Sequence, residues 1–417
     1  MGGNAIRALE LARAVAPQAA VTLAAPGRLP GEARDSIGHL AWDPADPRPL
    51  RPALAAADDV VLTPQGARVR SWARRSRARL VFDLYDPMPL EVLELHAEAS
   101  PARRRIANTV ALDHYLAALS DGDHFLCASE RQRDLWIGAL LAMRRISPAL
   151  YARDPTLREL IDVVPFGTPD QPPERGARAI RERFGALREG DQVVLWNGGI
   201  HAWLDPLTAI RAMPELVQRR PGARLIFMGR APLLPAEQAV ARSAQAEAER
   251  LALLDRIVFF NDRWVPYRDR AAWLLDADCT ISTHVDQLET RFAFRTRLLD
   301  SFWAGLPVVC TAGDELADRV VREGLGAAIE PSDPVAATRA LDQVLGRGKA
   351  AYAEALGRAA ADLAWSKVAR PLARLLAQPP PGRSPLLRMW RRSSQPGEAL
   401  RSLAARGVQT LRSRTPR

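Results

Sequence analysis

The stretch ETRFAFRTRLLDSFWAGLPVV, residues 289–309, joins a predicted helix to a predicted buried strand. Its helical part carries apolar residues at the i, i+1, i+4, i+5 spacing of a helix that lies on a sheet: Leu298, Leu299, Phe302 and Trp303. Gly305 and Pro307 end this helix, and the apolar run PVVCTAG follows directly. A helix that leads into a continuous apolar strand is typical of a parallel α/β sheet.

The same alternation occurs twice along the chain. Expected strands of the first half are AAVTLAAP, DDVVLTP, RLVFDLYD, HFLCAS and DVVPFG; those of the second are QVVLWNGG, ARLIFMGR, RIVFFND, DCTISTH, PVVCTAG and GAAIEP. Continuous apolar strands separated by helices indicate parallel sheets covered on both faces. The sequence therefore predicts an α/β fold with two Rossmann-like, doubly wound domains.

The Pro- and Gly-rich stretch VPFGTPDQPPERG marks the join between the two domains. We expect domains at residues 1–165 and 166–362, a closing helix at 363–377 and a basic tail rich in Pro and Arg at 378–417. From Pro379 onward, nine arginines stand against the single acid Glu398, which gives +8 of the net charge of +10. The body carries only the remaining +2, which argues against nucleic acid as a partner.

Composition limits the function further. No apolar run is long enough to span a membrane, and no secretory leader is recognisable, which predicts a cytoplasmic protein. The three cysteines lie in short apolar runs and lack neighbours at metal-ligand spacing, so we expect buried reduced thiols and no metal site.

Arginines gather at the start of the helix in the opening stretch. In a doubly wound sheet, ligands bind at the carboxyl ends of strands, where loops lead into helix N-termini. Arg295 and Arg297, with the free N–H groups near Thr296, would suit a diphosphate, and Asp300 one turn later would suit a ribose diol. The alternative is that these arginines pair with surface acids such as Asp286 and Glu289.

The chain up to about residue 377 resembles a family 4 glycosyltransferase of the GT-B fold, in which two Rossmann-like domains face each other across a cleft. The segments that carry this resemblance are GGNAIRALELARAVA, DHFLCASERQRDLW, VVPFG, VVLWNGGIHAWLDPLTAIRA, FFNDRWVPYRDRAAWLLDADCTIS and LLDSFWAGLPVV. The resemblance implies transfer of a sugar from a nucleotide-diphosphate-sugar to an acceptor hydroxyl, with retention of configuration and without metal or other cofactor. It also implies a donor held mainly in the C-terminal domain, and front-face attack in which the leaving phosphate helps to deprotonate the acceptor.

Two departures from the family pattern alter the expected site. Of the two glutamates usual in the family, the second falls on Asp300 and the first on Phe292; Glu289 is our substitute for the first. The phosphate-binding Lys of the family falls at about Leu204. We therefore expect Arg295 and Arg297 to supply the missing charge, and we group them with Glu289 as catalytic.

Further donor-side candidates follow from the resemblance and from loop positions. Gly198 and Gly199 would let the backbone approach the phosphates, or would simply form a tight turn. His201 would contact donor or acceptor, or only start a helix. The positions where the family holds the nucleobase are Asn261, Trp264 and Val265, with loop packing as the alternative for the Trp.

Acceptor-side candidates come from the first domain and comprise Gly2, Gly3, Asp83, Asp86, Ser129 and Gln132. Asp83 and Asp86 end a strand that faces the cleft, although Asp86 would also cap a turn before Pro87. Ser129 is at least a helix N-cap. Family members begin with a strand before the glycine loop, so we expect the first strand to be missing here and its two neighbours to have unpaired edges.

The function that the sequence predicts is a bacterial glycosyltransferase that builds a surface polysaccharide, a glycolipid or a glycosylated metabolite. Its acceptor would be a sugar, a lipid-linked group or a small molecule. Alternatives are another GT-B sugar-nucleotide enzyme, such as an epimerase or phosphorylase, and a non-catalytic sugar- or partner-binding relative. Arginine interleaved with apolar residues at 383–417 suggests peripheral binding to the inner face of the cytoplasmic membrane, with a disordered tail as the alternative.

Overall fold

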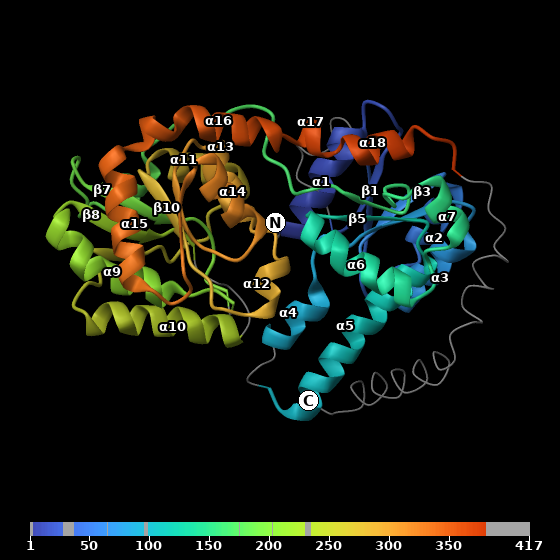
Figure 1. Cartoon of the computed structure of the whole chain (residues 1–417), viewed down its shortest axis with the longest axis horizontal. Coiled ribbons are helices and arrows are strands. Elements are labelled where there is room, and N and C mark those ends of the chain that lie inside the picture. The colour runs from blue at the N-terminus through green and yellow to red at the C-terminus, as the bar shows by residue number, and fades with distance from the viewer. Residues whose placement is uncertain are drawn as a thin grey trace.

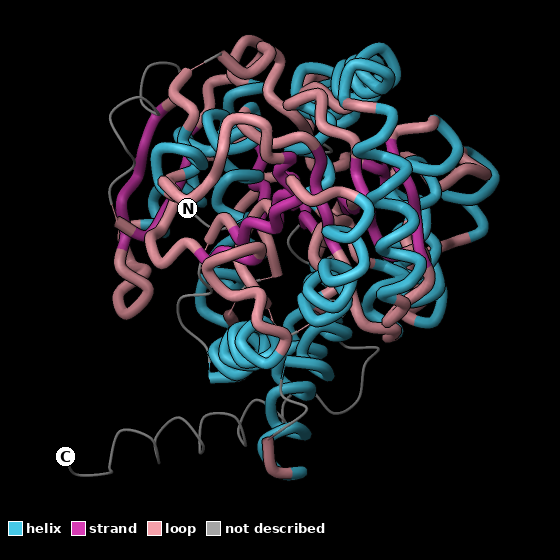
Figure 2. Tube along the Cα trace, turned by 90° about the vertical axis from the view of Figure 1, so that its left-hand side faces the viewer, coloured by secondary structure: helices cyan, strands magenta, loops and turns pink. Residues whose placement is uncertain are grey.

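The computed structural model forms two lobes, each built around a parallel β-sheet (Figure 1). It describes residues 3–27, 37–64, 66–95, 99–174, 176–201, 203–229 and 235–380. Seen from the side, helices enclose the strands of both sheets (Figure 2). The predicted α/β architecture with two Rossmann-like domains is confirmed.

The N-terminal lobe contains six strands and seven helices within the described residues. Its strands are β1 Thr22–Pro26, β2 Gly38–Trp42, β3 Asp59–Leu62, β4 Arg79–Asp83, β5 His124–Cys127 and β6 Ile161–Val163. Its helices are α1 Gly3–Val15, α2 Leu50–Ala56, α3 Ala67–Arg75, α4 Met88–Leu95, α5 Pro101–Asp121, α6 Glu130–Ala142 and α7 Pro148–Arg153.

The sheet of the N-terminal lobe is divided into two parts. Strands β1 and β2 pair only with each other, while β3, β4, β5 and β6 form a separate sheet in that order. Among the described strands, β1 and β3 therefore each have one partner. That a first strand is missing between these two sheets stays a prediction.

The C-terminal lobe contains a single six-stranded parallel sheet in the order β12-β11-β10-β7-β8-β9. Its strands are β7 Gln192–Trp196, β8 Ala223–Phe227, β9 Val258–Phe260, β10 Cys279–Ser282, β11 Val308–Thr311 and β12 Gly326–Ile329. The helices that follow the join are α8 Ala179–Arg183, α9 Pro206–Arg219, α10 Pro235–Arg250, α11 Arg270–Leu275, α12 Leu288–Phe292, α13 Thr296–Trp303, α14 Glu315–Glu323, α15 Pro334–Arg347 and α16 Ala353–Asp362. The strand order reverses between β10 and β7, which is where open α/β sheets bind ligands.

All eleven expected strands are present, and the structure adds β2, the short strand GHLAW. Its side chains are only half-buried or exposed, so it lacks the apolar run that marks the others. The helix expected at 363–377 is two helices, α17 Trp365–Val368 and α18 Arg370–Leu376. The break falls before Pro371, which has no N–H to continue the ladder.

The chain connects the lobes at two adjacent places. Thr168 N–H donates to Leu363 O at 2.8 Å, and Trp365 N–H donates to Thr168 O at 3.0 Å. Helices α17 and α18 then pack on α1 of the first lobe (Figure 1). One apolar cluster runs from Leu126 and Phe166 to the C-terminal core, so the lobes share packed side chains at this connection.

Three general expectations concern thiols, metals and membranes. Cys127, Cys279 and Cys310 are free and buried, as predicted, and burial raises the pKa of all three, that of Cys310 to about 12. Within the described residues, no group of three or more His, Cys, Asp and Glu is arranged to hold a metal ion. None of the described helices has both the length and the apolar character needed to cross a bilayer.

Candidate functional site

Polar residues gather at the carboxyl ends of β7 and β10, where the strand order reverses. Strand β7 leads into Asn197, Gly198 and Gly199, and β10 leads into Thr283 and His284. Helix α13 begins beside them, because the Asn197 Nδ2 amide donates to Arg297 O at 2.7 Å. The opening stretch of the sequence therefore lies at the switch point of the sheet, as predicted.

Arg297 lies at this switch point and has no carboxylate partner among the described residues. Its Nη2 donates to Gly199 O at 3.1 Å, and its Nη1 is buried with no hydrogen-bond partner. No carboxylate of the described residues lies within ion-pair distance of Arg297. Burial, followed by the charge of Arg295, lowers the pKa of Arg297 to about 10, so it remains charged at neutral pH. A largely buried guanidinium that has no negatively charged partner is costly unless an anion binds there.

Arg295 has a different environment from Arg297, although both were expected to hold a diphosphate. Its side chain forms an ion pair with Asp314, with 2.7 Å between Nε and Oδ2, and both side chains are buried. Its Nη1 also donates to Thr311 O at 2.8 Å. Arg295 thus pairs with an acid, but the acid is Asp314 of the α14 N-cap and not the suggested Asp286 or Glu289.

The glycine pair after β7 holds the turn against Arg297. Gly198 has a φ of +138°, which side chains rarely adopt, and a Cβ there would lie 3.5 Å from Arg297 Nη2. The Gly199 carbonyl accepts from both Arg297 and Trp196 Nε1, the latter at 3.3 Å. The pair forms a tight turn and at the same time brings backbone close to the arginine.

Several buried polar atoms around this turn have no hydrogen-bond partner: Asn197 Oδ1, Ser282 Oγ, His284 Nδ1 and Arg297 Nη1. Glu289 Oε2, on α12, is a further unpaired buried atom. Buried polar atoms in proteins are nearly always paired, so a concentration of unpaired ones indicates a place for a bound polar molecule. Asn197 and His284 were not predicted from the sequence. Asn197 directly follows β7, and His284 lies two residues after the end of β10; these positions at the ends of buried strands are the signal that would have found them.

His284 adds a neutral group to the site. Burial, followed by the charges of Arg295 and Arg297, lowers the pKa of His284 well below its usual value. Its backbone N–H is held by Thr311 Oγ1 at 2.9 Å, and it pairs with Leu204 in an isolated β-bridge. At neutral pH it therefore offers one ring nitrogen as donor and one as acceptor.

Glu289 lies on α12, where the C-terminal lobe meets α4 of the N-terminal lobe. It is buried, and burial raises the pKa of Glu289 to about 7, with Arg295 acting in the opposite direction and Asp86 in the same direction. The carboxyl group is therefore partly protonated at neutral pH. It can donate or accept a hydrogen bond where the two lobes meet.

Asp300, expected to bind ribose, is engaged by a residue that the sequence did not single out. Arg270 Nε donates to Asp300 Oδ1 at 3.0 Å, and the guanidinium lies 3.5 Å from the Tyr267 ring centroid and 4.5 Å from that of Trp303. Burial raises the pKa of Asp300, and Arg270 opposes this shift. Thr296, at the first position of α13, is half-buried.

The residues expected at the nucleobase have packing roles of their own. The Asn261 amide donates to Met228 O at 2.7 Å and to Arg263 O at 2.8 Å, so both of its N–H groups are used. Trp264 is 58% exposed, and Val265 packs partly against the core. His201 stacks on Trp203 with ring centroids 4.9 Å apart.

On the N-terminal side, the structure brings Asp83 and Asp86 to one cavity of about 270 Å³. Asp83 accepts from Arg7 Nε at 2.7 Å and from Arg7 Nη2 at 3.0 Å, so the two opposite charges form a buried ion pair. Asp86 accepts from Asn4 Nδ2 at 3.2 Å. Gly3 begins α1, and Gly2 lies outside the described residues.

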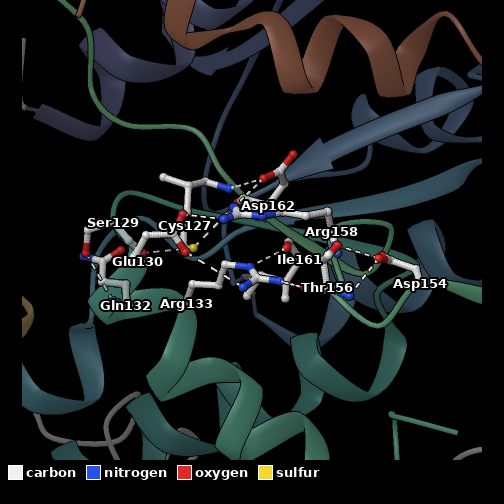
Figure 3. Close-up of polar contacts among 11 residues, drawn as sticks. Cys127, Ser129, Glu130, Gln132, Arg133, Asp154, Thr156, Arg158, Ile161 and Asp162 are labelled. Carbon is white, nitrogen blue, oxygen red and sulfur yellow. Dashed lines mark hydrogen bonds and ion pairs between the residues drawn. The ribbon is translucent and has the colours of Figure 1, made fainter. Parts of the chain in front are cut away.

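Ser129 and Gln132 organise the start of α6 (Figure 3). The Ser129 hydroxyl accepts from Gln132 N–H at 3.1 Å, so it is the N-cap that the sequence suggested. The Gln132 amide donates to Tyr85 O and to Phe292 O, both at 2.9 Å. Because Phe292 belongs to α12, Gln132 links the two lobes beside Glu289.

Comparisons with known proteins bear on the family and the fold. The family described as Glycosyl transferases group 1 matches residues 191–347. No curated protein is significantly similar to the chain.

The fold also matches solved structures. HepE of Anabaena, determined in complex with UDP and glucose, has a TM-score of 0.65 at 17% identity, over 90% of this chain and 96% of the other. WaaG, described as a glycosyltransferase involved in lipopolysaccharide biosynthesis, has a TM-score of 0.61 at 17% identity, over 90% of this chain and 96% of the other. Sucrose-phosphate synthase from Thermosynechococcus elongatus has a TM-score of 0.60 at 16% identity, over 90% of this chain and 93% of the other. Residues 191–347 therefore match the family described as Glycosyl transferases group 1, within a chain that has the overall fold of the solved GT-B glycosyltransferases.

Proposed function

We propose that the protein is a glycosyltransferase that takes a nucleotide-diphosphate-sugar as donor. The observation that carries this proposal is the group of unpaired buried polar atoms around Arg297, at the switch point of the C-terminal sheet. An arginine without a carboxylate, beside a glycine turn and a helix N-terminus, suits a diphosphate. The matched family and the neighbour solved with UDP-glucose support the same donor class.

Arg297 has the leading role in this proposal. Negative charge builds up on the diphosphate as its bond to the sugar breaks, and a fixed guanidinium in a buried site stabilises that charge. Arg295, paired with Asp314, would position the loop and add a weaker positive electrostatic potential at the diphosphate. Asp300 and Arg270 would orient the nucleoside, and His284 and Glu289 would hydrogen-bond the donor sugar.

The acceptor would enter from the N-terminal lobe, where Asp86 and Asn4 line the cavity and Glu289 faces it across the lobes. We propose transfer with retention and without a metal ion, in which the leaving phosphate receives the acceptor proton. The basic tail lies outside the described residues. Peripheral association with the inner face of the cytoplasmic membrane through that tail remains a prediction.

Incubation of the purified chain with a panel of nucleotide-diphosphate-sugars, starting with UDP-glucose, tests the proposal. We expect release of nucleoside diphosphate that is unchanged by EDTA, accelerated by the correct acceptor, and a product whose anomeric configuration matches the donor by NMR. Loss of nucleotide release in Arg297→Ala, with the thermal midpoint unchanged, would support the assigned site. Epimerised donor, phosphorolysis, or binding of every donor without turnover would each reject the transferase proposal.

A further inference from the structure

The cavity in the N-terminal lobe has a volume of about 270 Å³ and lies where β3 and β4 end, between helices α1, α4 and α5. Sites for drug-sized ligands occupy roughly 300–1,000 Å³, so this cavity encloses a group of about the size of one sugar ring. Pro64, Met88 and Tyr115 give it apolar walls against which such a ring can pack. The charges on the remaining wall then decide which acceptors fit.

Arg7, the arginine of the cavity wall, is engaged by groups of the protein itself. Its Nε and Nη2 donate to the two carboxylate oxygens of Asp83 at 2.7 and 3.0 Å. Nη1 donates to Pro165 O at 2.9 Å, and Nη2 also donates to Val164 O at 2.8 Å. Four of the five guanidinium N–H groups are therefore used, which leaves little capacity for a phosphate or carboxylate of a ligand.

His114 adds no positive charge to the cavity. Burial, followed by the charge of Arg70, lowers the pKa of His114, so its ring is neutral at neutral pH. Arg70 itself is paired with Asp121, with 3.4 Å between Nε and Oδ2. Among the described residues of the cavity wall, an anionic ligand would thus meet no cation without an acid partner.

Negative charge, in contrast, remains at this wall on Asp86. Its carboxylate accepts from Asn4 Nδ2 at 3.2 Å, and no cation of the described chain lies within ion-pair distance of it. Glu91, on α4, hydrogen-bonds to Asp86. Burial, followed by this bond, raises the pKa of Glu91 to about 10, so Glu91 keeps its proton at neutral pH and donates it to Asp86. The two groups together carry one negative charge that no ion pair balances.

A third carboxyl group approaches the same place from the C-terminal lobe. Glu289 is 5% exposed and its Oε2 has no hydrogen-bond partner. It lies on α12, which packs on α4, and Asp86 and Glu91 both interact with it electrostatically. Among the described residues, none of the three acids forms an ion pair. A buried group of this kind is costly unless a positively charged group enters.

We propose that the acceptor carries a primary amine, as an amino sugar or aminocyclitol does, and that its ammonium group binds at Asp86. An ammonium group donates three hydrogen bonds and keeps its charge, which suits the carboxylate of Asp86 and the carboxyl group of Glu91. A phosphate or carboxylate on the acceptor would bring like charges together and would be rejected.

The transfer step rests on the proposed function, whereas the preference for an amine does not. The bond between sugar C1 and the diphosphate oxygen breaks, and its electron pair stays with the diphosphate. An acceptor hydroxyl oxygen forms the new bond to C1, and the hydroxyl proton passes to the diphosphate. The ammonium group takes no part in bond making; it holds the acceptor while a hydroxyl reacts.

Binding of matched methyl glucosides to the full-length chain tests the proposal. Isothermal titration calorimetry at pH 6.5, where the amines are protonated, compares methyl glucoside with its 2-, 3- and 6-amino-deoxy analogues, their N-acetyl derivatives and glucose 6-phosphate. At least one amino analogue should bind about tenfold more tightly than methyl glucoside, because a hydrogen bond between charged groups replaces a neutral one. N-acetylation should abolish this gain, and glucose 6-phosphate should bind more weakly than methyl glucoside.

Two variants identify the carboxylate that is responsible. Asp86→Asn should bring the affinities for the amino analogue and for methyl glucoside to within about twofold of each other, and Asp86→Glu should restore part of the preference. Asp134→Asn removes an exposed acid from α6 as a matched control and should keep the tenfold preference. The comparison of glucosides on the parent chain needs no variant, so it stands even if a substitution at Asp86 unfolds the lobe.

Three outcomes would overturn the proposal: no amino analogue that binds better than methyl glucoside, tighter binding of glucose 6-phosphate, or a preference that survives Asp86→Asn. Donor turnover, measured in parallel, separates this proposal from the proposed function. If no donor is turned over but amines bind selectively through Asp86, only the transferase function is rejected. If neutral acceptors are glycosylated as fast as amino acceptors, the function stands and the amine is rejected.

Discussion

At the residue scale, Arg295 and Arg297 should respond differently to the same substitution. Arg297→Ala removes a charge that stabilises the departing diphosphate, which should lower the transfer rate by roughly 10² to 10³, about 2.7–4 kcal/mol, with the fold intact. Arg295→Ala leaves Asp314 buried without its partner, which should destabilise the fold by about 3–5 kcal/mol. Initial rates and thermal midpoints of both variants distinguish the two roles.

Two further variants control that comparison. Arg291 is exposed and lies farther from the glycine turn, so Arg291→Ala should keep a nearly normal rate and midpoint. Arg297→Lys should restore part of the rate, because lysine keeps the charge but lacks the fork of donors. A normal rate in Arg297→Ala would move the phosphate site away from this arginine.

At the element scale, the turn after β7 depends on glycine. Gly198→Ala places a Cβ on a residue with φ of +138° and 3.5 Å from Arg297 Nη2. We expect a loss of about 1–2 kcal/mol in unfolding free energy, together with a lower transfer rate because the turn shifts away from the arginine. Denaturant melts and initial rates provide the measurement.

Gly190→Ala is the matched control for this turn, since Gly190 lies just before β7 and nothing within 4 Å would meet its Cβ. It should melt like the parent chain and transfer sugar at the same rate. Equal behaviour of the two alanine variants would mean that the turn tolerates a side chain and that its glycine is not required for the site.

The elements themselves were largely predictable from the sequence, because buried parallel strands appear as unbroken apolar runs. The exception, β2, pairs with a single strand and its residues are half-buried or exposed, so they do not form that pattern. The partners of charged residues were not predictable in the same way. Asp314 and Arg270 become partners of Arg295 and Asp300 through loop geometry that no periodicity encodes. His284 was missed because its position after a strand is its only mark in the sequence, without a motif to go with it.

At the scale of the whole molecule, acidic groups of both lobes meet at the cleft. Burial raises the pKa of Glu289 to about 7 and that of Glu91 to about 10, the latter helped by a hydrogen bond to Asp86. A carboxyl group with a raised pKa binds its proton more tightly in the folded state than in the unfolded state. The contribution of Glu289 to stability therefore falls as pH rises from about 4.5 to 7, and the full penalty for Glu289 applies above pH 7.

Glu289→Gln should remove the cost in folding free energy of ionising the buried Glu289, and should leave that of Glu91 unchanged. At pH 8 the variant should be more stable than the parent by up to about 3 kcal/mol, and the difference should vanish near pH 4.5. Denaturant unfolding at both pH values measures it, and the exposed Glu249→Gln is the control, with no expected difference at either pH. A parent chain as stable as the variant at pH 8 would show that Glu289 is ionised without strain.

The paired connection at Thr168 and Trp365 has a mechanical consequence for the two lobes. A single covalent linker permits both bending and twisting, whereas two chain segments hydrogen-bonded side by side resist torsion and leave bending as the easy motion. Trp365 lies against Gly167 and Phe166, which places a bulky ring at the pivot. Any bending between the lobes should therefore keep the same two faces opposite each other, so that Glu289 and Asp86 hold one relative orientation about this axis.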